Sequence, residues 1–215
     1  VQSSTLLWMA LAGEIEPIDA VIFSDTKWEP QTVYDHLERL KLQTQAAGIP
    51  FYEVSAGNIR ADALDPTKRF ASMPAYILNP DGTKGMGRRQ CTTEYKLTPI
   101  LRKQRELAGL QPRQRSKEHL MDTVIGISWD ETQRMRDAAY PWMRNVYPLV
   151  DLRMTRDDCL QWCRDHGHEL PPRSACIGCP YKSNAEWRRL KIEAPTEWAD
   201  AVAFDEAIRD GHGRT

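Results

Sequence analysis

Strand-like and helix-like segments alternate along the first 130 residues of the sequence, and this alternation restricts the possible folds more than any other feature. Short apolar runs occupy residues 18–25, 50–55, 73–82 and 122–131. Amphipathic or short helical patterns lie between them, at residues 30–48, 58–64 and 92–108. Such a rhythm predicts a mostly parallel sheet with helices on both faces. We therefore expect a doubly wound, Rossmann-like α/β fold.

The pattern changes after residue 134. Thr155 and Asp158 form a capping-box pair, and a second pair, Ser183 and Glu186, follows a Pro-rich stretch at 169–183. Each pair predicts the start of a helix. We expect an α/β domain at residues 1–140 and a small helical, cysteine-bearing region at 141–215.

Composition indicates a globular protein whose charge is unevenly distributed. Hydrophobic residues make up 41% and charged residues 27%, with a formal net charge of −1, which gives no overall attraction to nucleic acid or anionic lipid. Residues 85–117, which we call the basic belt, nevertheless carry nine Lys or Arg against two Glu. The belt is either a solvated helix face or a surface for phosphates or a polynucleotide.

Nothing in the sequence suggests a membrane partner or secretion. No apolar run approaches the roughly 18 residues of a membrane span, and no signal-peptide pattern is present. Five cysteines, two of them in a CxxC pair, favour metal or redox chemistry in a reducing compartment over disulfides. We expect a cytoplasmic protein.

The CxxC pair, Cys176 and Cys179 in "RSACIGCPY", is the sharpest chemical signal. Thiolates at this spacing suit zinc or an iron–sulfur cluster, although two inert buried thiols are the alternative. Zinc would need further ligands, for which the segment upstream offers candidates: Cys159, Cys163, His166 and His168. The two cysteines of that segment lie four residues apart among apolar helix positions, which favours a packing role for them.

The remaining cysteine, Cys91, follows Arg88 and Arg89 and precedes a helical segment that carries Lys96. A thiol at a helix N-terminus beside cations is typical of a ligand or a nucleophile. Composition alone does not say whether Cys91 lies next to the CxxC pair.

Several motifs resemble the phosphoadenosine phosphosulfate (PAPS) reductase-like family of the PP-loop ATP pyrophosphatases, and the resemblance covers nearly the whole chain. "VQSST" at the start resembles the end of a glycine–serine loop that cradles phosphate, which implies that Ser3 and Ser4 contact a nucleotide. The loop glycines and the strand before them are not in the sequence, so we expect it to begin within the fold. The family fold is adenine nucleotide alpha-hydrolase-like.

Two further segments carry the resemblance. "FSDTKWEPQTVYDHL" is similar to the family's "DTGxExPET", which implies that Asp25 and Thr26 lie near the nucleotide; Lys27 stands where the family has glycine. Asp25 could instead cap the following helix. "QCTTEYKLTP" is similar to the segment in which cluster-bearing adenylylsulfate reductases have two adjacent cysteines, although Thr92 replaces the second one, a form closer to sulfur-transfer proteins of DNA phosphorothioation.

The resemblance implies a site. Cys91, Cys176 and Cys179 would hold a 4Fe–4S cluster, with ATP or another adenine nucleotide and Mg²⁺ as further cofactors. Cys91, Lys96 and Arg134 would be catalytic, the last because "GISWDETQRMR" resembles a segment whose arginine faces the anionic substrate. Glu131 and Arg134 could also be a simple surface ion pair. Arg88 and Arg89 would help to bind the nucleotide.

The implied activity is ATP-dependent sulfur transfer to an acceptor, with a sulfur donor protein and a nucleotide or nucleic-acid acceptor at the basic belt as partners. A sulfonucleotide reductase is an alternative, but the family's C-terminal "ECGxH" nucleophile is absent, since the last cysteine is Cys179. A third hypothesis is a non-catalytic nucleic-acid-binding module with zinc held by Cys163, His166, Cys176 and Cys179.

Overall fold

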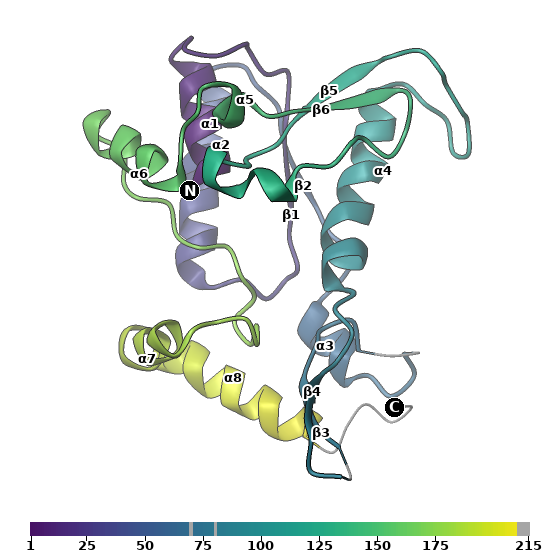
Figure 1. Ribbon diagram of the computed structural model, residues 1–215, viewed down its shortest axis with the longest axis vertical. Helices are drawn as coiled ribbons and strands as arrows, with labels where there is room; N and C mark the ends of the chain where they lie inside the picture. The colour runs from purple at the N-terminus through teal and green to yellow at the C-terminus, as the bar shows by residue number, and fades with distance from the viewer. Residues whose placement is uncertain (69–70, 80, 210–215) are drawn as a thin grey trace. The chain divides into compact units, whose positions relative to one another are not determined.

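A computed structural model describes residues 1–68, 71–79 and 81–209 of the chain. The α-helices, shown in Figure 1, are α1 (Gln2–Leu11), α2 (Gln31–Ala46), α3 (Ile59–Leu64), α4 (Thr98–Leu107), α5 (Pro148–Asp151), α6 (Arg156–Asp165), α7 (Asn184–Glu193) and α8 (Pro195–Ile208). The strands are β1 (Val21–Ser24), β2 (Phe51–Val54), β3 (Tyr76–Leu78), β4 (Lys84–Met86), β5 (Met121–Val124) and β6 (Met143–Val146). A π-helical segment, η1 (Thr92–Leu97), and a 3-10 segment, η2 (Trp129–Arg134), complete the elements.

The described strands pair two by two, so the protein is mixed α/β with short sheets. β1 pairs with β2, and the bonds from Val21 N to Pro50 O and from Asp25 N to Val54 O keep a constant offset, as parallel strands do. β5 and β6 are also parallel, whereas β3 and β4 form an antiparallel hairpin. A single doubly wound sheet is not formed by these pairs, whose strands have only three or four residues each.

Several strand boundaries differ from the sequence expectation. The strand expected at 122–131 ends at Val124, and η2 takes up its polar end. The run at 73–82 gives only the short strand β3, and its expected closing turn includes Pro80, which lies outside the described residues. β4 and β6 were not expected, because neither has a clear alternation of apolar and polar residues.

The chain forms two compact units, each built from three separate segments. Unit 1 contains Val1–Val21, His36–Phe51 and Gln104–Arg173, and unit 2 contains Ile22–Asp35, Tyr52–Lys103 and Ser174–Thr215. The expected domain boundary at residue 140 falls inside the third segment of unit 1 and does not separate them. Segments distant in the sequence pack together, so a division along the chain could not have found these units.

The core of unit 1 surrounds α1, which is apolar over most of its circumference and buries seven of its residues. One side packs Leu6 and Met9 against Leu149 and Cys159, and the other packs Leu7 and Trp8 against Leu40 and Cys163. Within this unit α1 contacts both α5 and α6.

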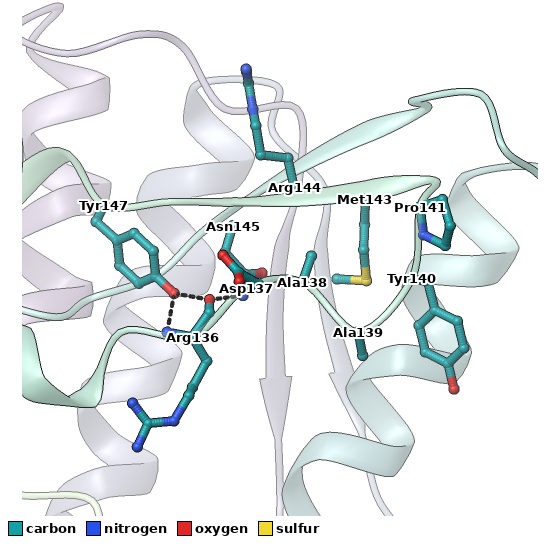
Figure 2. A pocket seen from close by; sticks show the side chains of 10 residues that line it. All are labelled: Arg136, Asp137, Ala138, Ala139, Tyr140, Pro141, Met143, Arg144, Asn145 and Tyr147. Carbon is teal, nitrogen blue, oxygen red and sulfur yellow. Dashed lines mark hydrogen bonds between the residues drawn. The ribbon is translucent and has the colours of Figure 1, made fainter.

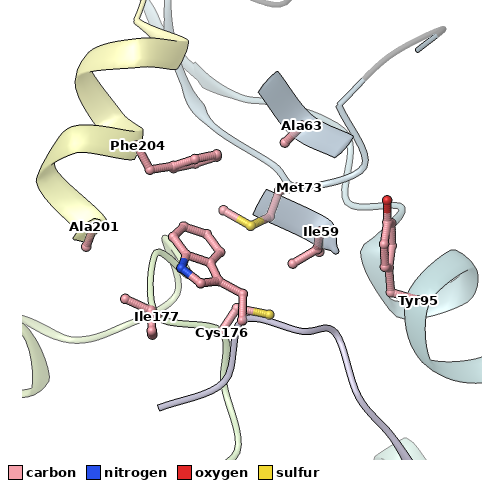
Figure 3. Packing of buried hydrophobic residues seen from close by; sticks show 9 residues of the cluster. Ile59, Ala63, Met73, Tyr95, Cys176, Ile177, Ala201 and Phe204 are labelled. Carbon is pink, nitrogen blue, oxygen red and sulfur yellow. The ribbon is translucent and has the colours of Figure 1, made fainter. Parts of the chain in front are cut away.

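The core of unit 2 is a second apolar cluster, made of Trp28, Ile59, Ala63, Met73, Tyr95, Cys176, Ile177, Ala201 and Phe204. We call it the Trp28 cluster. In Figure 3, Cys176 and Ile177 enter it from the CxxC turn, while Ala201 and Phe204 come from α8. α8 also packs against α3 and α7. This cluster positions the CxxC turn described below.

Local sequence signals account for several helix ends. Both expected capping boxes form: the Thr155 hydroxyl accepts from the Asp158 amide at the start of α6, and Ser183 does the same with Glu186 at α7. None of the described helices has the length and apolar character needed to cross a membrane.

Pro99 explains a departure from the helix expected over residues 92–108. A proline has no N–H, so Pro99 cannot donate to the carbonyl oxygen of Tyr95 four residues earlier. The Ser24 hydroxyl donates to that oxygen instead, at 2.6 Å. Just before the proline, Thr98 N donates to Thr93 O, five residues back, which is the π-helical pattern of η1.

Candidate functional site

The CxxC turn is held against the loop that follows β1. Ile177 N donates to Trp28 O at 2.8 Å, and Cys179 N donates to Cys176 O at 3.0 Å within the turn. Gly178 lies directly against Trp28: a Cβ on this glycine would come within 2.3 Å of the indole ring. The glycine between the two cysteines is therefore required by the approach of Trp28, which the sequence did not suggest.

Three of the five cysteines belong to the Trp28 cluster. Cys176 is a buried member, and Cys179 and Cys91 are partly buried at its edge. Cys91 lies at the N-terminus of η1, as expected, and its amide donates to Ser72 O at 2.9 Å. These are the three residues expected to bind a cluster.

Cys176 lies in a setting that favours the neutral thiol. Burial, reinforced by the charge of Glu29, raises the pKa of Cys176 to about 11, while the Thr26 hydroxyl and the charge of Lys96 act in the opposite direction. The Thr26 hydroxyl oxygen lies 3.2 Å from the sulfur. Thr26, expected near a nucleotide, therefore contacts a thiol.

A buried carboxylate next to Thr26 escaped the sequence analysis. The side chain of Glu29 has no exposed surface, accepts from Ser174 at 3.2 Å and from Thr26 at 3.3 Å, and lies 3.7 Å from the Lys96 ammonium. A buried carboxylate is stable only when it is paired and hydrogen-bonded in this way. The sequence clue to Glu29 is its position in "DTKWEP", the segment that the sequence analysis selected for Asp25 and Thr26.

Asp25 organises the loop after β1. It is buried, accepts from Lys27 N at 2.7 Å and from the Tyr34 hydroxyl at 3.0 Å, and forms an ion pair with the Lys27 ammonium. Burial raises the pKa of Tyr34 to about 12. Lys27 has a left-handed backbone with φ of 59°, a conformation that glycine adopts most easily.

In unit 1, Ser3 and Ser4 lie in the first turn of α1 and have different surroundings. Ser4 is buried, and its hydroxyl oxygen lies 2.9 Å from Nε2 of His36. Ser3 is exposed and lies against Gly126, where a Cβ would come within 2.8 Å of the Ser3 amide nitrogen. Only Ser3 of the expected pair has a side chain open to solvent.

Arg134 is mostly exposed and forms an ion pair with Glu131. Glu131 in turn accepts from Gln2 at 2.8 Å, and Gln2 accepts from Arg156 at 2.9 Å. The surface ion pair named as an alternative for Arg134 is thus present, and it is connected to the first turn of α1.

The other candidate ligands, Cys159, Cys163, His166 and His168, belong to unit 1, where the two cysteines lie in the core, His168 is half-buried and His166 is exposed. Cys159 and Cys163 are fully buried, and burial raises the pKa of Cys159 to about 11. His168 stacks on Trp8 with ring centroids 4.0 Å apart, and His166 stacks on Trp162 at 3.9 Å. The packing role favoured for the two cysteines agrees with this burial. Among the residues described, no three His, Cys, Asp or Glu side chains are already arranged as a metal site.

The basic belt is mainly exposed cations. Arg88 and Arg89 are exposed, and Arg89 lies over the ring of Tyr181 with 4.9 Å from its guanidinium carbon to the ring centroid. Arg105 donates to the carbonyl oxygens of Gln111 and Gln114, which fixes the loop after α4.

Unit 1 also has an open pocket of about 460 Å³, whose lining includes none of the expected site residues (Figure 2). It lies between the loop 136–141 and β6. Tyr147 and Asn145 shape it by donating to the carbonyl oxygen of Arg136, at 2.6 and 2.9 Å. The lining offers no cluster of reactive groups that would suggest chemistry.

Comparisons of the chain with models of protein families, with curated proteins and with solved structures find no match. The functional argument therefore depends on the residues and their contacts.

Proposed function

We propose that this chain is an ATP-dependent sulfur transferase in which Cys91, Cys176 and Cys179 hold an iron–sulfur cluster. The observation that carries the proposal is the membership of the Trp28 cluster, which these three cysteines share. Cys159 and Cys163 pack instead in the core of unit 1. Thiols from two distant parts of the chain, in one apolar setting, are donors of the kind that iron–sulfur clusters use.

The donor set fits such a cluster in its chemistry, although the site is not preformed in the described residues. Binding would require the three sulfur atoms to move together, and deprotonation of Cys176 would have to overcome the effect of burial. A cluster with three protein ligands would supply an iron site that can carry sulfide. Lys96 would help by favouring the thiolate of Cys176, since its positive charge lowers the pKa that burial raises.

The proposed reaction replaces an oxygen of the acceptor by sulfur. The acceptor oxygen attacks the α-phosphorus of ATP and pyrophosphate leaves; a sulfur nucleophile, provided by a donor protein, then displaces AMP. Ser3, at the exposed start of α1, is proposed to contact phosphate, because helix N-termini favour anions. Asp25, Thr26, Arg88, Arg89 and Arg134 remain proposed nucleotide or substrate contacts, with Mg²⁺ as the counterion of the phosphates.

The proposal includes the finer fold assignment, an adenine nucleotide alpha-hydrolase-like fold of the PAPS reductase-like family. Two parallel strand pairs support it, because parallel strands need the crossover connections typical of this class. The basic belt is the proposed surface for the acceptor.

The test is anaerobic purification with iron, acid-labile sulfide and zinc quantified. We expect about four irons per chain and a broad absorbance band at about 400 nm in the wild type. Cys91→Ser and Cys176→Ser should each lose the iron, because both remove a ligand. Cys159→Ala is the matched control and should keep it, since that thiol belongs to the core of unit 1.

Full iron retention in Cys91→Ser would contradict the ligand set. A colourless protein with one zinc per chain would instead favour the non-catalytic, zinc-binding nucleic-acid module. Release of pyrophosphate from ATP, measured with candidate acceptors, then separates sulfur transfer from sulfonucleotide reduction, which needs no ATP cleavage.

A further inference from the structure

The hairpin of β3 and β4 presents an apolar face to solvent. Tyr76 is paired with Met86, and Leu78 with Lys84. Directly opposite residues, and residues two apart in a strand, point to the same side of a sheet, so these four side chains share one face. Tyr76 and Leu78 are 71% and 72% exposed, and Met86 is 37% exposed.

Such a face is unusual for a two-stranded ribbon, which gains little stability unless its apolar side is covered. The hairpin is fixed at its base, where Gly87 N donates to Ala75 O at 2.8 Å. A Cβ on Gly87 would be 3.4 Å from the Ala75 backbone, so the two chains approach closely there. The exposed side chains thus extend from an anchored base.

The charges around this face are positive. Lys84 lies on the face itself and Arg88 follows Met86 by two residues; both are exposed. In the part of the chain that the structure describes, neither forms an ion pair or a side-chain hydrogen bond. The acid of the hairpin, Asp81, instead accepts from the amide and hydroxyl of Thr83, at 2.9 and 2.6 Å. The face therefore favours an anionic partner that also has flat apolar surfaces.

We propose that the β3–β4 hairpin binds a single-stranded nucleic acid. The ring of Tyr76 stacks on a base, Leu78 and Met86 supply apolar contact, and Lys84 and Arg88 contact phosphates. Stacking on an aromatic side chain requires an unstacked base, which a single strand offers and a duplex does not. This inference deepens the proposed function, because it identifies the class of the sulfur acceptor. Only that identification rests on the proposed function; the binding itself is argued from the hairpin.

The test is fluorescence anisotropy of the full chain with a fluorescein-labelled oligothymidine of about 15 nucleotides, a length within reach of one binding groove. We expect Tyr76→Ala to weaken binding by about tenfold and Tyr76→Phe to leave it nearly unchanged, because phenylalanine keeps the ring. Lys84→Ala and Arg88→Ala should each lower the slope of log affinity against log salt by about 0.7, the value for one phosphate contact on a single strand. Arg189→Ala, which removes an exposed cation from α7, is the matched control and should not change the slope.

Unchanged affinity in Tyr76→Ala and an unchanged slope in both cation variants would overturn the proposal. The proposal would also be overturned if the face were an interface between two copies of the chain. In that case Leu78→Asp would abolish concentration-dependent self-association, measured by analytical ultracentrifugation, and would leave the oligonucleotide affinity unaltered. A duplex of the same length that binds as tightly as the single strand would also contradict it. Iron content is measured on the same preparations. A wild type that holds iron but does not bind the oligonucleotide would contradict this inference alone, whereas a wild type that binds the oligonucleotide without iron would contradict the proposed function alone.

Discussion

Gly178 and Trp28 touch so closely that a single added carbon on the glycine would lie 2.3 Å from the indole ring. They are also joined through Ile177, whose amide donates to Trp28 O. The Trp28 indole N–H, in turn, donates to Asp200 in α8 at 2.6 Å. The position of the CxxC turn is therefore coupled to α8 through one tryptophan.

Gly178→Ala should destabilise the protein, because the new methyl group must displace either the turn or the ring. Overpacking of this kind costs about 1–3 kcal/mol. Urea unfolding followed by tryptophan fluorescence measures the change in free energy of unfolding. Gly85→Ala is the control, since a Cβ there would meet nothing closer than 3.8 Å; equal stability of the two variants would contradict the contact.

Ser24→Ala should also destabilise the protein. The Ser24 hydroxyl satisfies the Tyr95 carbonyl oxygen that Pro99 leaves without its helical partner, and an unsatisfied buried acceptor costs about 1–3 kcal/mol. Chemical denaturation of the variant gives the value directly.

Pro99→Ala tests the cause of that contact. The alanine amide can donate to Tyr95 O as in an ordinary α-helix, so the double variant Ser24→Ala/Pro99→Ala should lose less stability than Ser24→Ala alone. A double-mutant cycle measures this coupling. Strict additivity of the two free-energy changes would mean that Pro99 does not leave this carbonyl to Ser24.

The five thiols should react at different rates in the metal-free protein. Cys91 and Cys179 are partly exposed and should react first with iodoacetamide, whereas the buried thiols of Cys159, Cys163 and Cys176 should wait for unfolding. The raised pKa values of Cys159 and Cys176 slow them further, because the thiolate is the reactive form. Peptide mass spectrometry after a timed reaction checks the order, and early modification of Cys159 would contradict it.

Local signals in the sequence predicted local structure well. The capping boxes at Thr155 and Ser183 formed because a cap requires only residues three apart. The helix predicted over residues 30–48 from its apolar periodicity was confirmed as α2 (Gln31–Ala46), with both ends within two residues.

Contacts between distant segments could not be predicted in the same way. Position 178 requires glycine because the ring of Trp28 lies against it. The π-helical turn before Pro99 leaves the Tyr95 carbonyl oxygen to the hydroxyl of Ser24, which comes from a distant segment. The burial of Glu29 depends likewise on Ser174 and Lys96. The sequence predicted a site at Cys91, Cys176 and Cys179, and that site stays a prediction. The membership of these three residues in the Trp28 cluster depends on packing that no spacing encodes.

His36 should make the stability of unit 1 depend on pH. Burial lowers the pKa of His36 to about 4 in the folded chain, while the unfolded chain retains the ordinary value of 6.5. The unfolded state therefore binds the proton first as pH falls: stability is complete above about pH 6.5 and declines between there and the folded-state pKa. From about pH 7.5 to about pH 5 the loss of unfolding free energy due to His36 should be about 2 kcal/mol.

Urea unfolding at both pH values measures this loss, and His36→Gln should show a loss smaller by that amount, because glutamine does not titrate. Wild type and variant with equal losses would show that the imidazole beside Ser4 is not protonated on unfolding in this range.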